Sequence, residues 1–388
     1  MPDAAAPARS GLRAVFSHPG LLLAGAAAFA MSTLFSALKP VLLTRFLEET
    51  SWGEGRAGLV VAAPFVGIAV SSLLYYLHPP RATVRQLGLL LGAALVILEW
   101  LSSRYFSVFA VIVPMQFAAG FCVGALMAAT SRLVAVSSAP DESFGFIDMT
   151  AVALMSFMVA GIGAAVAVGG VSGAYRFAAL LSLVYAALIV SYAESPSLRA
   201  HHDCPQGPIV MGGRPLAVIA MGMLFVTCSG LGFAFMFSLA GNLGMDYDEA
   251  GSRIGLLLLV SAAACQFGGW CSGRFGPRYP LLCAFFACAG GWWLAIHAES
   301  QTVFMLALIP AVFALQFNFP ILLALSGSLD AHGRWAGIAA PLITSGFAWA
   351  AITAGLLVEH HGLVSLSYAT LLGIGACLLL LWPATRGT

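Results

Sequence analysis

The chain alternates long apolar segments with short polar connections. Runs near 20 apolar residues, the length that a helix needs to cross roughly 30 Å of hydrocarbon, recur along the whole sequence, and strand-like alternation is absent. Each run predicts one membrane-spanning helix. The twelve predicted helices cover residues 21–43, 57–77, 87–101, 108–136, 146–168, 177–192, 216–239, 254–271, 281–297, 303–325, 336–358 and 363–381.

One connection is longer and more polar than the others. Residues 194–214, "ESPSLRAHHDCPQGPIVMGGR", are rich in Pro and Gly and predict a cytoplasmic linker. It would join an N-terminal six-helix bundle, residues 1–193, to a C-terminal one, residues 215–388. Arg81 and Arg85 recur as Arg274 and Arg278 at one constant shift, as a duplicated six-helix unit would produce.

Composition narrows the class of protein. Hydrophobic residues make up 60% of the chain and charged residues 9%, whereas a soluble domain carries about 25% charge. We therefore predict an all-α membrane protein with twelve transmembrane helices in two pseudo-symmetric bundles. The net charge of +1 gives no reason to expect nucleic-acid binding. Adjacent histidines (201–202 and 360–361) and scattered cysteines lack the spacing of a metal site, so we expect neither a metal nor a cofactor.

The distribution of arginine predicts the orientation of the chain. Loops on the side of the two termini hold more arginines than the loops on the other side, which places both termini in the cytoplasm by the positive-inside rule. Nearly all basic residues are Arg, and Lys39 is the single lysine. Such usage suggests a GC-rich bacterial genome, so we expect a multi-pass protein of a bacterial inner membrane, surrounded by lipid and acting as a monomer.

Polar side chains inside the spans are candidates for solute binding, because they are costly in a bilayer. The amides flanked by Phe317 and Phe319 suit a neutral or zwitterionic small molecule. Lys39 precedes a proline in the first span and is either a cavity cation or a lysine that reaches the outer surface. The predicted solute-binding residues are Lys39, Gln116, Gln266, Gln316 and Asn318.

Three charged residues near span ends need separate explanations. Arg132 and Asp148 fall at similar depth on adjacent spans, so we expect them to form an ion pair that is structural or belongs to a gate. Asp148 is also the best candidate for a titrating group. Glu99 lies near the end of the third span, where we expect it at the membrane interface.

The stretch "GGWCSGRFGPRY", residues 268–279, resembles a known signature. Gly269, Arg274, Gly276 and Arg278 match the Gly-x-x-x-Asp-Arg-x-Gly-Arg-Arg loop of the major facilitator superfamily, but Gly273 stands at its acidic position. The corresponding first-half loop keeps only Arg81 and Arg85. The resemblance implies that these loops gate the protein, and Asp141 and Asp330, in other cytoplasmic turns, are candidate partners for the arginines.

The resemblance implies a secondary active transporter that moves a small organic solute by alternating access, in the direction of efflux. Family members often couple transport to protons, commonly with an arginine in the fourth span, where Gln116 stands here. That departure, with the scarcity of buried acids, leaves an uncoupled facilitator open and disfavours strongly cationic drugs. A non-transporting assembly factor or sensor is the main alternative. Nothing in the sequence predicts an enzyme.

Overall fold

The computed structural model describes residues 19–78, 81–137, 139–192, 212–245, 247–330 and 334–386, and the regular structure in them is helical. The helices of the first half are α2 (Pro19–Glu49), α3 (Glu54–Leu77), α4 (Val84–Tyr105), α5 (Phe109–Ala135) and α6 (Pro140–Ser191). Those of the second half are α8 (Gly213–Ala234), α9 (Met236–Asn242), α10 (Tyr247–Phe275), α11 (Arg278–Ile296), α12 (Gln301–Gly327), α13 (Arg334–Thr344), α14 (Gly346–His361) and α15 (Ser365–Ala384).

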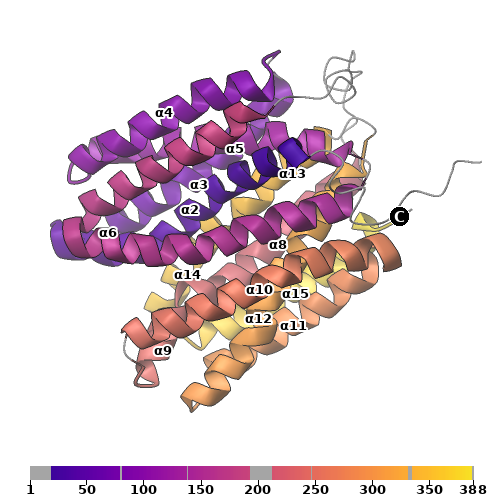
Figure 1. The fold of residues 1–388 in the computed structure, drawn as a ribbon. Coiled ribbons are helices and arrows are strands. Elements are labelled where there is room, and N and C mark those ends of the chain that lie inside the picture. The colour runs from indigo at the N-terminus through magenta and orange to yellow at the C-terminus, as the bar shows by residue number, and fades with distance from the viewer. Residues whose placement is uncertain are drawn as a thin grey trace, which may run out of the picture.

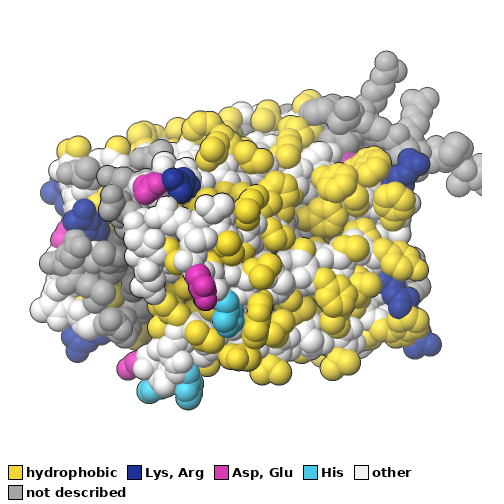
Figure 2. Space-filling model, turned by 90° about the horizontal axis from the view of Figure 1, so that it is seen from below, with side chains coloured by type: hydrophobic (Ala, Val, Ile, Leu, Met, Phe, Trp, Pro, Cys, Tyr) yellow, Lys and Arg dark blue, Asp and Glu magenta, His cyan; other side chains and the backbone are white. Residues whose placement is uncertain are grey.

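Twelve stretches of these described helices are long and apolar enough to span a membrane, which confirms the predicted number. Large apolar side chains such as Leu372, Leu379 and Phe157 are exposed on the outside of the helices, where a bilayer would cover them. In Figure 2 hydrophobic side chains cover the middle of the molecule, and Lys and Arg gather toward its two ends. The chain is therefore a multi-pass membrane protein.

The break predicted between the fifth and sixth spans, around residues 169–176, is found as a kink at Gly170, so it is shorter than predicted. The helix α6 runs through both spans and only Gly170 departs from helical geometry, with φ 56° and ψ −145°. The carboxylate of Glu49, at the end of α2, accepts a hydrogen bond from the Val171 backbone N–H at 3.2 Å, and the Ser172 hydroxyl donates to the Ser103 carbonyl. These contacts satisfy donors that the kink would otherwise leave free.

The helices fall into two groups, α2–α6 and α8–α15 (Figure 1). One close contact recurs in both. A Cβ built on Gly67 of α3 would collide with the Phe117 carbonyl of α5, and a Cβ on Gly268 of α10 would collide with the Phe317 carbonyl of α12. The second and fourth spans of each half thus pack alike, which accords with a duplicated unit. The predicted linker lies mostly outside the described residues, so the limits of the two bundles stay predictions.

The two groups touch most closely near the end of the molecule where the described chain begins at Pro19 and ends at Arg386, which we call the termini end. A Cβ built on Gly269 of α10 would lie 2.5 Å from the Asp141 carbonyl oxygen of α6. One built on Gly337 of α13 would lie 2.7 Å from the Ala128 oxygen of α5. Toward the opposite end the two groups of ribbons diverge (Figure 1). Glycine therefore permits closure of the bundles at the termini end.

Candidate functional site

A pocket lies between the two groups of helices, about halfway along them. Four of its lining residues come from α2, and the rest come from both halves of the chain. They are Phe29, Ser32, Thr33, Ser36, Met127, Asp148, Val152, Met155, Phe233, Leu258, Leu315, Gln316, Phe319, Thr344 and Phe347. A cavity shared by two bundles is the place where a solute would contact both of them.

The helix α2 contributes a polar stripe to this pocket. Ser32, Thr33 and Ser36 follow Phe29 at helical spacing and therefore share one face of the helix. This stripe was visible in the sequence as hydroxyl side chains three or four residues apart within an otherwise apolar span. The Thr33 hydroxyl donates to the Ala30 carbonyl at 3.0 Å, so its hydrogen is already used within the helix.

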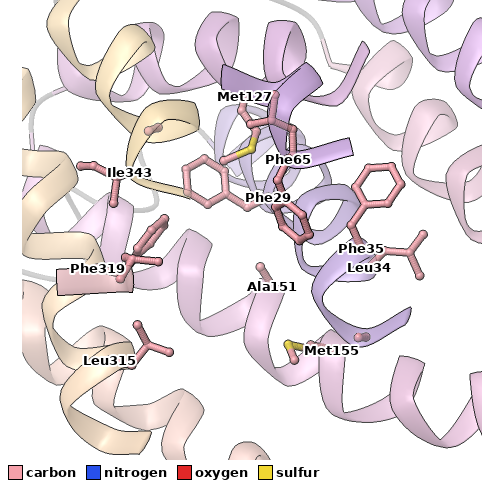
Figure 3. Close-up of a cluster of buried hydrophobic side chains, with 14 of the residues drawn as sticks. Phe29, Leu34, Phe35, Phe65, Met127, Ala151, Met155, Leu315, Phe319 and Ile343 are labelled. Carbon is pink, nitrogen blue, oxygen red and sulfur yellow. The ribbon is translucent and has the colours of Figure 1, made fainter. Parts of the chain in front are cut away.

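Aromatic side chains from both groups meet at the pocket. In Figure 3 Phe29 and Met127 from the first group face Phe319 and Ile343 from the second. The rings of Phe29 and Phe319 lie edge to face with centroids 6.3 Å apart, a favourable arrangement for two phenyl rings. Nearby, Phe65 of α3 and Phe347 of α14 make a second ring contact between the groups, at 6.5 Å. The apolar part of the pocket wall is thus built by both halves.

Asp148 is the ionisable residue among the lining side chains. It follows the start of α6 by two turns, about 12 Å of helix, and only 3% of its surface is exposed. The Cys265 thiol of α10 lies within hydrogen-bonding reach of the carboxylate, and the Oδ2 atom has no hydrogen-bond partner. The predicted ion pair between Asp148 and Arg132 is not found among the contacts of the described residues. The Cβ atom of Arg132 lies beside Gly337 of α13.

Of the five predicted solute-binding residues, the structure places Gln316 in the pocket wall. Gln116 lies instead inside the first bundle, where its amide donates to the Ser102 hydroxyl at 3.0 Å. Gln266 lies where α10 packs on Gly145 of α6, and Asn318 is fully buried. None of these three amides is among the residues that line the pocket. Lys39 belongs to α2, but its side chain lies outside the described residues, so its role stays a prediction.

Glu99 is buried rather than interfacial, which corrects the prediction. The helix α4 continues to Tyr105, so Glu99 lies farther from its end than the predicted span implied, and 1% of its surface is exposed. Its carboxylate lies near the Gln116 amide and the Tyr175 side chain. Within the described part of the chain, neither carboxylate oxygen nor the Tyr175 hydroxyl has a hydrogen-bond partner. A buried polar cluster of the first bundle was therefore missed by sequence reasoning.

The glycines of the loop signature at the end of α10 let this helix pack closely against α6. Gly269 and Gly273 face Asp141 and Glu142, the first acidic residues of α6. The Asp141 carboxylate bonds the Ser272 side chain rather than an arginine. Gly276 has the positive φ, 73°, that the sharp turn requires.

The arginines of the predicted gate lie on the surface. Arg274 lies over the Trp270 and Phe275 rings, and Arg278 lies 3.8 Å from the centroid of the Trp382 ring. Arg81 and Arg85 are exposed as well. Asp330 accepts a hydrogen bond from the Trp335 backbone. Among the contacts of the described residues, Arg274 and Arg278 meet aromatic rings rather than Asp141 or Asp330, so the predicted pairing is not found there.

Comparison with known proteins shows what fold this is. No protein-family model matches the chain, and no curated protein does either. Solved structures do match. XylE, described as a proton:xylose symporter, has a TM-score of 0.71 at 15% identity, with 95% of each chain covered. The human organic anion transporter MFSD10 has a TM-score of 0.70 at 17% identity, covering 98% of this chain and 100% of that one.

A third match is the fucose:proton symporter FucP of E. coli. Its TM-score is 0.63 at 14% identity, and 94% of this chain and 97% of that chain are covered. Sequence identities this low carry information on fold rather than on substrate. Because the matches extend over nearly the whole chain, and XylE is described as a major facilitator superfamily protein, the chain has the fold of the major facilitator superfamily.

Proposed function

We propose that the chain is a secondary transporter that moves a small organic solute across the membrane by alternating access. The observation that carries the proposal is the pocket shared by both groups of helices, halfway along them, with close inter-bundle packing at the termini end. Such a pocket, reached from one end at a time, is the arrangement that alternating access requires. Transport activities described for XylE, FucP and MFSD10 support it.

The orientation proposed from the arginines gives this conformation a direction. If the protein lies in a bacterial inner membrane with both termini on the cytoplasmic side, the pocket faces outward and the glycine contacts close the cytoplasmic side. Efflux then requires a second conformation in which these contacts part. The loops that carry Arg81, Arg85, Arg274 and Arg278 are proposed to gate that change, through Gly269 and Gly273 rather than through ion pairs.

Asp148 is the proposed site of proton coupling. A carboxylate in the pocket wall, with one oxygen free of hydrogen bonds, can exchange a proton with whichever side of the membrane the pocket faces. XylE and FucP are described as proton symporters, which favours coupling over an uncoupled facilitator. Neither an enzymatic reaction nor a cofactor is part of this proposal, and the protein acts as a monomer within lipid.

The test uses purified protein in liposomes that hold a pH-sensitive dye. Candidate solutes (amino acids, sugars, organic acids and organic cations) are added singly. We expect one class to produce a proton flux that is lost in Asp148→Asn and kept in Glu299→Gln, which removes one acid from the exposed loop between α11 and α12. Solute uptake without proton movement would remove Asp148 from the mechanism. Absence of flux with every class would favour a non-transporting assembly factor or sensor.

A further inference from the structure

The pocket holds one acid among largely apolar side chains. Asp148 is its ionisable lining residue, and no arginine, lysine or histidine is among the described residues that line it. The Oδ2 atom of Asp148 lacks a hydrogen-bond partner. An unpaired carboxylate is costly to bury unless a positive charge approaches it. A ligand with one positive charge would supply the counter-charge for Asp148 that the described part of the pocket wall lacks.

The rest of the wall suits the body of such a ligand. Phe29, Phe233, Phe319 and Phe347 bring four phenyl rings to the pocket from α2, α8, α12 and α14. Ring faces attract an ammonium group, most strongly away from water, and their apolar surface favours a hydrophobic ligand. Because these helices belong to both bundles, a ligand seated among the rings would contact both halves of the transporter.

The same wall fits a sugar poorly, although several structural neighbours are described as sugar symporters. A sugar needs many hydrogen-bonding partners, and part of the polar capacity of the pocket is used within the protein. The Thr33 and Thr344 hydroxyls donate to the carbonyls of Ala30 and Ala340. Polar groups without a partner would then be buried on the ligand, at a cost for each one.

We propose that the substrate is a lipophilic monovalent cation, an amine or quaternary ammonium compound with an aromatic or branched apolar body. This inference rests on the proposed function and adds its substrate class. It also revises the expectation that the scarcity of acids disfavours cations, because the structure brings one acid into the pocket. One carboxylate matches one positive charge, so a single charge is expected and not two.

Binding of two probes of similar size and opposite charge tests the proposal. Phenylbutyltrimethylammonium keeps its positive charge at every pH, and 5-phenylpentanoate is an anion. Titration calorimetry is performed on detergent-purified wild type, Asp148→Asn and Glu299→Gln. We expect the cation to bind wild type and Glu299→Gln, and to bind Asp148→Asn about 10-fold more weakly or worse, as for loss of a buried charge partner. The anion should bind none of them measurably.

Two results would overturn the substrate class. One is binding of the anion as tight as that of the cation, which would direct attention to Lys39, three residues beyond Ser36 on α2. The other is absence of cation binding to wild type. The comparison of cation with anion needs no variant, so a misfolded Asp148→Asn protein does not obscure it. If the anion or a neutral solute drives flux in liposomes, transport stands and only the substrate class fails.

Discussion

At the scale of single residues, burial separates groups that look alike in the sequence. Asp148 and Glu99 are both buried acids, but Asp148 lines the shared pocket while Glu99 lies among α4, α5 and α6 inside one bundle. A ligand that enters the pocket can reach the first and not the second. This difference supports the proposed role of Asp148 with solute and proton, and we propose a structural role within the first bundle for Glu99.

The role of Glu99 can be tested through stability. Glu99→Gln keeps the size of the side chain and removes an acid whose oxygens have no hydrogen-bond partner. Because an unpaired charge is unfavourable in an apolar interior, we expect an unchanged or higher melting temperature in detergent, measured by intrinsic fluorescence. Glu299→Gln, an exposed acid, serves as the control. A fall of several degrees in Glu99→Gln alone would mean that the ionised carboxylate stabilises the fold.

At the scale of elements, a glycine determines the junction of the fifth and sixth spans. Gly170 adopts a φ of 56° and a ψ of −145° within α6, a combination open to glycine almost alone. Glu49 of α2 bonds the backbone just after it. The kink therefore fixes how the end of α2 and the two parts of α6 meet, at the end of the molecule away from the termini.

Replacing this glycine should be costly, whereas replacing its neighbour should not. In Gly170→Ala a Cβ would meet the Glu49 carboxylate and the backbone would be strained, so we expect a loss of about 1–3 kcal/mol. The measurement is a lower melting temperature in detergent. Gly169→Ala is the matched control, because no atom lies within 4 Å of its built Cβ. Equal melting temperatures for the two variants would contradict the assignment.

The sequence predicted the membrane-spanning helices better than it predicted which side of each helix lines the pocket. The number and approximate position of the spans and the turn at Gly276 followed from pattern and motif. Of the predicted solute-binding residues, Gln316 lines the pocket, whereas Asp148, which also lines it, was predicted as a gating or titrating residue. Gln116, Gln266 and Asn318 do not line this pocket. Their spans are apolar all round, so periodicity does not reveal which side faces a cavity. Phe319 was noted beside the amides of its span, but Phe29 gave no signal, since phenylalanine suits lipid, core and ligand alike.

At the scale of the whole molecule, the proposed transport requires two bundles that move against each other. Only one arrangement is described, with contact at the termini end through residues such as Gly269, Gly337 and Gly327. A transporter must also visit the reverse arrangement, whereas an assembly factor or sensor need not. A change of distance between the bundles, in opposite senses at the two ends, therefore distinguishes these functions without knowledge of the substrate.

The most direct measurement is pulsed electron resonance between spin labels on the two bundles. One pair, Ser107 and His361, reports on the end away from the termini, and another, Ser191 and Tyr279, on the termini end; all four are exposed. The exposed Cys283 and Cys204 are first replaced. We predict two populated distances for each pair. When the cation or a pH change is applied, the distance between Ser107 and His361 should shorten while the distance between Ser191 and Tyr279 lengthens. One fixed distance per pair under all conditions would contradict alternating access.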